Sequence, residues 1–182
     1  MMANEVIQIN DLKFREYIDS EQIQKRIIAL SKEIDAALTC KEAIFLGILN
    51  GCFIFMADLI RNCQSEQEVK FIKLSSYEGK ESTGKIVSSG SLGSELNNRH
   101  IVIVEDIIDS GLTMNWITQK LADLGVASIR IVTLLLKPDA LEFPLKIDHV
   151  GFEIPNNFVV GYGLDYNGKG RNLKSIYTLI EN

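Results

Sequence analysis

The most informative part of the sequence is Ile101-Val102-Ile103-Val104-Glu105-Asp106-Ile107-Ile108-Asp109-Ser110-Gly111-Leu112-Thr113. It begins with the apolar run Ile101 to Val104, which together with His100 is typical of a strand buried on both faces. Two adjacent carboxylates follow, and then hydroxyl groups and a glycine lead into a helix that Gly125 is expected to end. This stretch therefore predicts a strand, a polar loop and a helix in succession.

Similar units lie on both sides of this stretch. Apolar runs predict buried strands over residues 43–49, 69–74 and 128–136. Apolar residues at helical spacing predict one helix from Asp19 or Ser20 to Leu38, with Gln22 placed to complete a capping box, and residues 53–61 predict another. Strands that alternate with helices in this way indicate an α/β fold, with a parallel twisted sheet flanked by helices.

The last third of the chain has a different pattern. Residues 150–154, 158–162 and 175–180 resemble strands without helices between them. We therefore expect one domain over residues 1–182, with a small β-rich hood formed mainly by about residues 138–182 and the N-terminal segment. Residues 75–94 are polar, and a loop of that length is more often a functional lid than a simple connection.

Composition narrows the class of protein. The 182 residues are 46% hydrophobic and 24% charged, as in an ordinary globular protein, and the net charge of −5 does not suit a general nucleic-acid or membrane-surface binder. Cys40, Cys52 and Cys63 are odd in number and form no C-x2-C pair, so we expect reduced thiols rather than disulfides or zinc. The sequence shows neither a signal peptide nor a membrane span, which favours the cytoplasm.

The candidate site lies where the parallel strands end. Ligands of open parallel sheets bind beyond the carboxyl ends of the strands, where the segments after Leu49, Val104, Leu136 and Val160 converge. Residues 109–113 would place the N-terminus of a helix there, which attracts anions. Carboxylates beside an anion site suit a ligand with sugar hydroxyls and metal-bridged phosphates. Taken alone, however, a Glu-Asp pair is more often a pair of solvated loop acids.

The thirteen-residue stretch resembles the phosphoribosyl-diphosphate motif of type I phosphoribosyltransferases. Its form Glu-Asp-Ile-Ile-Asp-Ser-Gly is similar to that of the hypoxanthine-guanine branch, and the likeness extends to Leu49-Asn50-Gly51, Ser76-Tyr77, residues 134–137, 150–155 and 158–167, and Arg171. The resemblance implies transfer of a 5-phosphoribosyl group from phosphoribosyl diphosphate to N9 of a 6-oxopurine, giving IMP or GMP and pyrophosphate. It also implies Mg²⁺, a homodimer or homotetramer, and no nucleic-acid or membrane partner.

The resemblance assigns roles within the acidic motif. Glu105 and Asp106 would hold the ribose hydroxyls, and Asp109, Ser110, Gly111, Leu112 and Thr113 would bind the 5′-phosphate. Asp109 would also be the catalytic proton acceptor near purine N7. Magnesium would be held by Glu105, Asp106 and Asp165.

Other roles fall on residues outside the motif. The purine would be bound by Lys137, Phe158, Val159 and Asp165, and the pyrophosphate by Arg171 and the loop Leu49-Asn50-Gly51, where the family often has a cis peptide. Many relatives have a basic residue where this chain has Asn50, so its pyrophosphate contact would be weaker or made by the backbone alone. Ser76 and Tyr77 would begin a flexible loop that closes over the site.

Two alternative functions share this fold. A nucleotide-sensing regulator would show a basic nucleic-acid face and often lack the catalytic acid, whereas this chain is acidic and has Asp109. An enzyme for orotate, uracil or adenine would be expected to differ at Lys137 and over residues 158–165. Without the resemblance, Lys137 would be read as a surface lysine and Phe158 as core. The alternative for residues 75–94 is a disordered surface loop.

Overall fold

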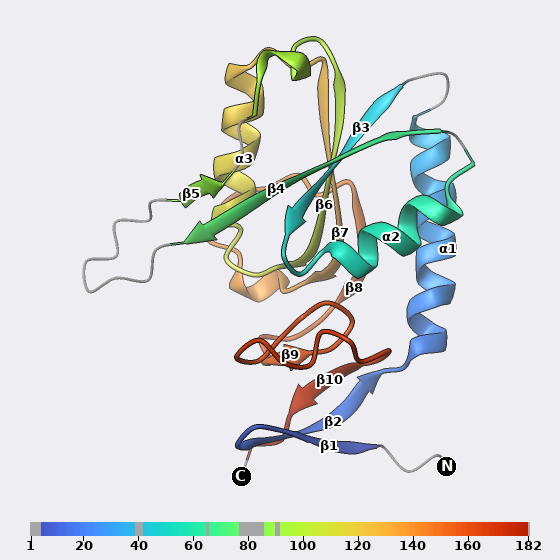
Figure 1. The fold of residues 1–182 in the computed structure, drawn as a ribbon, viewed down its shortest axis with the longest axis vertical. Helices are drawn as coiled ribbons and strands as arrows, with labels where there is room; N and C mark the ends of the chain where they lie inside the picture. The colour runs from blue at the N-terminus through green and yellow to red at the C-terminus, as the bar shows by residue number, and fades with distance from the viewer. Residues whose placement is uncertain (1–4, 39–41, 65, 77–85, 90–91, 182) are drawn as a thin grey trace.

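The computed structural model describes residues 5–38, 42–64, 66–76, 86–89 and 92–181 (Figure 1). The larger of its two sheets has six strands in the order β5-β4-β3-β6-β7-β8. Neighbouring strands are parallel except for β5, which is antiparallel to β4. The strands are β3 (Ala43–Leu49), β4 (Glu68–Ser76), β5 (Ile86–Ser89), β6 (His100–Ile108), β7 (Ser128–Leu136) and β8 (His149–Glu153).

Helices cover both faces of this sheet, as predicted. The helices α1 (Ser20–Ala37) and α2 (Phe53–Asn62) lie on one face and α3 (Leu112–Asp123) lies on the other (Figure 1). Their apolar residues form separate cores on the two faces, which explains why the central strands are apolar throughout. Two short 3-10 helices, η1 (Ser94–Leu96) and η2 (Pro138–Ala140), lie in the connections.

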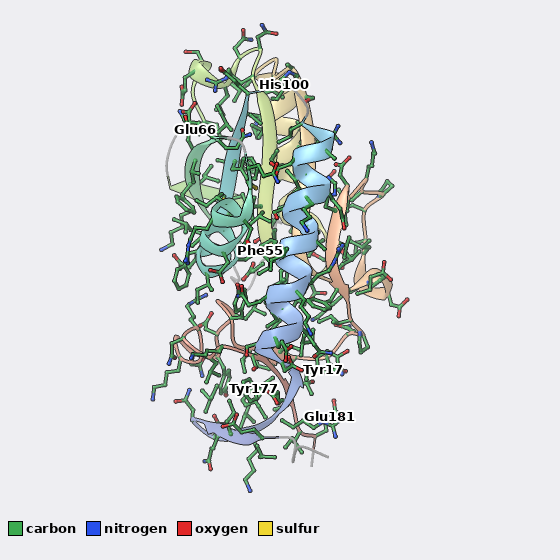
Figure 2. The ribbon with its side chains drawn as sticks, turned by 90° about the vertical axis from the view of Figure 1, so that its right-hand side faces the viewer. Tyr17, Phe55, Glu66, His100, Tyr177 and Glu181 are labelled. Atoms are coloured by element: carbon green, nitrogen blue, oxygen red, sulfur yellow. The ribbon has the colours of Figure 1, made fainter. Side chains whose placement is uncertain are left out.

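The start of α1 follows from its sequence. The Asp19 side chain accepts a hydrogen bond from the Gln22 N–H, and the Gln22 side chain accepts one from the Asp19 N–H, so the predicted capping box is confirmed. Four buried apolar residues, Ile23, Ile27, Leu30 and Ile34, then face the sheet at helical spacing. Figure 2 shows α1 running lengthwise over the sheet, with Phe55 of α2 beside it and Tyr17 and Tyr177 beyond its first turn.

The smaller sheet is the hood. Its four antiparallel strands lie in the order β1-β2-β10-β9, with β1 at Val6–Ile9, β2 at Leu12–Ile18, β9 at Val159–Val160 and β10 at Ile176–Leu179. Figure 1 shows it beyond the carboxyl ends of the parallel strands. A small core around Phe14, Val160 and Tyr177 holds it together. No helix in the described part of the chain is long and apolar enough to cross a membrane.

The structure corrects three details of the sequence prediction. The strand predicted for the hood at residues 150–154 is β8, which pairs in parallel with β7 at the edge of the main sheet because residues 137–148 form the required crossover. Strand β6 continues to Ile108, so Glu105 and Asp106 belong to the strand and not to the loop after it. The polar stretch 75–94 contains β5, while Tyr77 and the rest of residues 77–85 are outside the described residues.

Candidate active site

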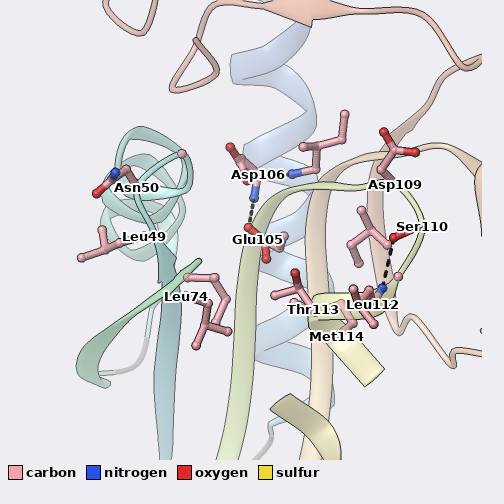
Figure 3. Close-up of a pocket in the computed structure, with 15 residues that line it drawn as sticks. Leu49, Asn50, Leu74, Glu105, Asp106, Asp109, Ser110, Leu112, Thr113 and Met114 are labelled. Carbon is pink, nitrogen blue, oxygen red and sulfur yellow. Dashed lines mark hydrogen bonds between the residues drawn. The ribbon is translucent and has the colours of Figure 1, made fainter. Parts of the chain in front are cut away.

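A cavity opens at the carboxyl ends of the central strands (Figure 3). It is lined by residues 48–51 after β3, by Leu74 of β4, and by residues 105–114, which run from β6 into α3. All of the residues assigned to the ribose, the 5′-phosphate and the pyrophosphate loop therefore share one cavity. Arg171 is the exception among the predicted phosphate ligands, because it does not line the cavity but lies in the hood segment, residues 158–175, which contains β9 and leads to β10.

Two buried carboxylates dominate the floor of the cavity. Glu105 and Asp106 are only 7% and 8% exposed, and Glu105 Oε1 accepts a 3.3 Å hydrogen bond from the Asp106 N–H. Burial, and then the neighbouring Asp106 carboxylate, raises the pKa of Glu105 well above its usual range. Burial also raises the pKa of Asp106, although hydrogen bonds and the positive charge of Arg171 oppose that rise. Such a pair favours a ligand that brings hydroxyl donors or a cation.

The loop after β3 packs directly on this acidic pair. A Cβ atom on Gly51 would lie 1.5 Å from Asp106 Oδ2, so only glycine allows the backbone to come this close. The Leu49–Asn50 peptide bond is cis, although Asn50 is not a proline. Asn50 is exposed at the cavity wall opposite Asp106 (Figure 3).

The opposite wall is the turn that leads from β6 into the N-terminus of α3. Gly111 has φ +81° and precedes α3 as its N-cap, without a side-chain cap from any described residue. The Ser110 hydroxyl accepts a 3.4 Å hydrogen bond from the Leu112 N–H. The backbone N–H groups at the start of α3 have no partners within the helix, and together with the helix dipole they make this turn suitable for a phosphate.

Asp109 and Lys137 meet at the rim, although they are 28 residues apart in sequence. Lys137 Nζ donates to Asp109 Oδ2 over 2.8 Å. The lysine is only 7% exposed, so it is not an ordinary surface lysine, whereas about half of the Asp109 side chain (53%) is exposed. The predicted purine-binding amine and the predicted proton acceptor are therefore in direct contact.

The remaining predicted residues lie in the hood segment. Arg171 forms a 2.5 Å ion pair with Asp165 and donates to the Gly163 carbonyl over 2.6 Å. The other Asp165 oxygen accepts from the Gly168 N–H, and Asp165 forms no three-carboxylate cluster with Glu105 and Asp106 among the described residues. The structure thus brings two of the three predicted metal ligands together and places the third beside Arg171.

The predicted purine contacts lie outside the cavity lining. Phe158 is 43% exposed and packs edge-on against Tyr166, with the ring centroids 5.8 Å apart. Val159 is buried in β9, where it pairs with Thr178 of β10. Phe158 borders a separate surface depression next to Arg15 and Thr178.

Comparisons with known proteins agree with this geometry. The family model described as a phosphoribosyl transferase domain matches residues 15–167. A hypoxanthine-guanine phosphoribosyltransferase of Staphylococcus aureus is 41% identical over 93% of this chain and 95% of its own, and one of Bacillus subtilis is 40% identical over 89% and 91%. The chain belongs to the hypoxanthine-guanine phosphoribosyltransferase family.

Solved structures of hypoxanthine-guanine phosphoribosyltransferases share the fold. A Staphylococcus aureus hypoxanthine phosphoribosyltransferase superposes with a TM-score of 0.86 at 38% identity, covering 91% of this chain and 90% of that one. A Bacillus anthracis hypoxanthine-guanine phosphoribosyltransferase, crystallised with HEPES in its active site, gives 0.86 at 34% identity over 95% and 100%. The expected type I phosphoribosyltransferase fold is confirmed.

Sequence reasoning missed some residues of the hypoxanthine-guanine phosphoribosyltransferase site. Ile48, Leu74 and Met114 also line the cavity, but as apolar residues in a strand or helix they carried no chemical signal. Tyr162 lies between two glycines that both have positive φ values. The glycines on both sides of Tyr162 are a sequence signal for an unusual backbone conformation at this position.

Proposed function

We propose that this chain transfers the 5-phosphoribosyl group of phosphoribosyl diphosphate to N9 of a 6-oxopurine, giving IMP or GMP and pyrophosphate. One observation carries the proposal: the buried pair Glu105 and Asp106 lies between the N-terminus of α3 and the Gly51 backbone in a single cavity. That arrangement pairs acceptors for sugar hydroxyls with donors for phosphates. Membership in a family whose relatives carry this activity supports it.

The donor substrate would be held along the cavity. Glu105 and Asp106 accept from the ribose hydroxyls, and residues 109–113 bind the 5′-phosphate through backbone N–H groups and the Ser110 and Thr113 hydroxyls. Leu49, Asn50 and Gly51 contact the pyrophosphate through the backbone, because Asn50 has no charge. Arg171 supplies the positive charge there.

The purine would bind between the rim and the hood. Lys137 donates to the 6-oxo group, Phe158 stacks on the ring, and Val159 offers backbone groups to its edge. Asp165 is the fourth residue of the proposed purine site. Asp109 accepts the proton near N7 as the new bond to N9 forms. The loop that begins at Ser76 and Tyr77 closes to exclude water.

The acidic floor fits a magnesium ion. Two buried carboxylates with raised pKa values gain an opposite charge when a cation approaches, and Mg²⁺ prefers carboxylate oxygens, water and substrate phosphates to a complete protein cage. Glu105 and Asp106 would hold it directly or through the ribose hydroxyls, with Asp165 reaching it through water. When bound, Mg²⁺ neutralises charge on the departing diphosphate.

The wider setting follows from the same proposal. The chain acts as one domain in the cytoplasm, as a homodimer or homotetramer, on phosphoribosyl diphosphate and a 6-oxopurine base. Its partners include neither nucleic acid nor a membrane, in keeping with the net charge of −5.

The test is an assay of base preference. Purified protein, Mg²⁺ and phosphoribosyl diphosphate are incubated with hypoxanthine, guanine, xanthine, adenine, uracil or orotate, and nucleotide formation is followed by absorbance. Turnover of 6-oxopurines alone is expected. Turnover of another base would contradict the base assignment, and tight GMP binding without any turnover would indicate a regulator.

A further inference from the structure

Three elements meet in a hydrogen-bonded cluster behind the cavity. The Tyr162 hydroxyl of the hood segment donates to the Asp58 carboxylate of α2. The Gln24 amide of α1 donates to the same Asp58 oxygen over 2.9 Å and lies 3.3 Å from the Tyr162 hydroxyl. The cluster thus ties the hood to both helices on one face of the main sheet.

Tyr162 has an unusual backbone for a large residue. Its φ is +50°, between Gly161 at +101° and Gly163 at +104°. The left-handed region costs about 1–2 kcal/mol for a residue with a side chain, so the surroundings must hold it there. The ring is buried at 4% exposure, and its hydroxyl bond to Asp58 is the polar contact that fixes its far end.

The residue after Tyr162 contacts the predicted pyrophosphate loop. A Cβ on Gly163 would lie 2.1 Å from the Gly51 carbonyl oxygen, so the two backbones are in direct contact. The Gly163 carbonyl also accepts from Arg171 Nη1 over 2.6 Å, and the Gly163 N–H donates to the Arg171 carbonyl over 3.0 Å. Gly163 therefore lies between the loop and the arginine that are both assigned to the diphosphate.

Asp58 is fixed relative to the same loop from the other side. Helix α2 begins directly after Gly51 and Cys52, and the Met56 N–H donates to the Cys52 carbonyl over 2.7 Å. A rigid turn and a half of helix thus separates Asp58 from the loop. The hydrogen bond from Tyr162 to Asp58 completes a closed series of contacts. The loop Leu49–Gly51 leads into α2, Asp58 of α2 bonds to Tyr162, and Gly163 next to Tyr162 contacts Gly51 of the loop.

We propose that Asp58 and Tyr162 are positioning residues that set the spacing between the loop Leu49–Gly51 and Arg171, and through it the affinity for the diphosphate group of phosphoribosyl diphosphate. This inference rests on the proposed function. The purine contacts Phe158 and Val159 are held separately, because β9 pairs with β10. Losing the cluster should therefore weaken binding of the diphosphate more than binding of the base.

The protonation of the cluster suits this role. Burial raises the pKa of the Tyr162 hydroxyl, and its hydrogen bond to Asp58 adds to that rise. The charged groups around the hydroxyl are Asp58 itself, Arg61, which lies 3.5 Å from the other Asp58 oxygen, and Glu21 and Lys174, which line the same surface depression. The phenol stays a donor throughout the range in which the enzyme is assayed.

The experiment compares four variants of the full chain. Tyr162→Phe keeps the buried ring and removes one oxygen, and Asp58→Ala removes the acceptor. Asp58→Asn keeps an oxygen that can accept from Tyr162 and serves as the rescue. The matched control is Tyr177→Phe, which removes a 2.9 Å bond from a buried tyrosine to Glu5 entirely within the hood.

Three quantities are measured for each variant: KM for phosphoribosyl diphosphate, KM for hypoxanthine, and the Kd for GMP, which lacks a diphosphate. We expect Tyr162→Phe and Asp58→Ala to raise KM for phosphoribosyl diphosphate about tenfold, since a hydrogen bond to a charged group is lost. KM for hypoxanthine and Kd for GMP should rise less than about twofold. Asp58→Asn and Tyr177→Phe should stay near wild type. Calorimetric titration with magnesium pyrophosphate should show a matching loss of affinity in Tyr162→Phe and Asp58→Ala.

The proposal is overturned by unchanged KM values, or by equal losses in all three quantities for Tyr162→Phe. Failure of Asp58→Asn to restore the KM also contradicts it. If Asp58→Ala does not fold, the comparison of Tyr162→Phe with Tyr177→Phe decides the question. Wild-type turnover is measured first and tests the proposed function separately, while the pyrophosphate titration tests the inference without turnover.

Discussion

At the scale of single residues, the contact between Lys137 and Asp109 has the clearest bearing on chemistry. An ammonium group has three N–H donors, so Lys137 Nζ can keep its 2.8 Å bond to Asp109 and still donate to a purine oxygen. The contact also holds the Asp109 carboxylate in place while half of its side chain stays exposed to accept a proton. Base recognition and proton transfer would then share one ion pair.

Replacing Asp109 with Asn tests its role as proton acceptor. The amide keeps the size of the carboxylate but has almost no basicity, so kcat should fall about 10²-fold or more. Steady-state kinetics with hypoxanthine measures the change. Asp139→Asn, in the exposed η2 segment nearby, is the control and should leave kcat unaltered. An Asp109→Asn enzyme as fast as wild type would remove the role.

Gly51→Ala tests the close approach of the loop to the acidic pair. The new Cβ would meet Asp106 Oδ2 at 1.5 Å, so either the carboxylate or the loop must move. A displacement of about 1 Å at a reacting centre can cost 10²-fold, so we expect kcat/KM for phosphoribosyl diphosphate to fall by about that factor.

The control for this change is Gly93→Ala, where the nearest described atoms to the added Cβ belong to the end of the flexible Glu95 side chain. It should keep wild-type kinetics. Full activity in Gly51→Ala would mean that the close contact between Gly51 and Asp106 has no role in catalysis.

At the scale of elements, sequence patterns were reliable where burial is uniform and less so elsewhere. The predicted strands 43–49 and 128–136 coincide with β3 and β7, because a short continuous apolar run flanked by polar turns is typical of a buried strand. Strand β6 was predicted four residues too short, since Glu105 and Asp106 interrupt the apolar run that defined it. Buried acids inside a strand contradict the usual pattern, and here they mark the functional site.

Other elements depend on contacts that are distant in sequence. Strand β2 was not predicted, although its buried residues Phe14 and Ile18 alternate with exposed ones as in a half-buried strand. β8 was assigned to the wrong sheet because its own sequence does not specify its neighbour, β7. The pairing of Lys137 with Asp109 joins two strand ends whose distance only the folded sheet determines, so no spacing rule could predict it.

The capping box of α1 gives a prediction for stability. Asp19→Ala removes the acceptor of the Gln22 N–H, so the free energy of unfolding should fall by about 1 kcal/mol. Urea denaturation followed by circular dichroism measures it. Lys25→Ala is the control, because it removes only an exposed ion pair with Glu21 and should cost no more than about 0.5 kcal/mol. Equal losses in the two variants would contradict the cap.

At the scale of the whole molecule, the acidic site lowers the stability of the free protein. Folding buries Glu105 and raises its pKa above the ordinary value of 4.5, so the folded state binds more protons than the unfolded state above that pH. The sign follows: as pH rises from about 4.5 through the raised folded value, stability falls. Function near neutral pH therefore opposes stability in the absence of ligands.

Glu105→Gln separates these two effects. In metal-free buffer with a chelator, the variant should have a higher Tm than wild type at neutral pH, and a smaller change in Tm between pH 5 and pH 8, because no buried charge forms. Its turnover should fall. Glu153→Gln, an exposed acid at the end of β8, is the control and should match wild type in both measurements. A lower Tm for Glu105→Gln would contradict the pKa argument.

The hood contains the first and the last described strands of the chain, β1 and β10. The first and last parts of the described chain are also tied to this sheet, because Glu5 accepts from the Tyr177 hydroxyl and the Ile180 N–H donates to the Lys13 carbonyl. The same sheet contains β9, which carries Val159. An affinity tag, fluorophore or surface linker fused close to β1 or β10 would therefore pull on the sheet that is proposed to cover the purine. Immobilised or tagged preparations should be attached instead at the opposite end of the main sheet, near the turn at Gly125 that precedes β7.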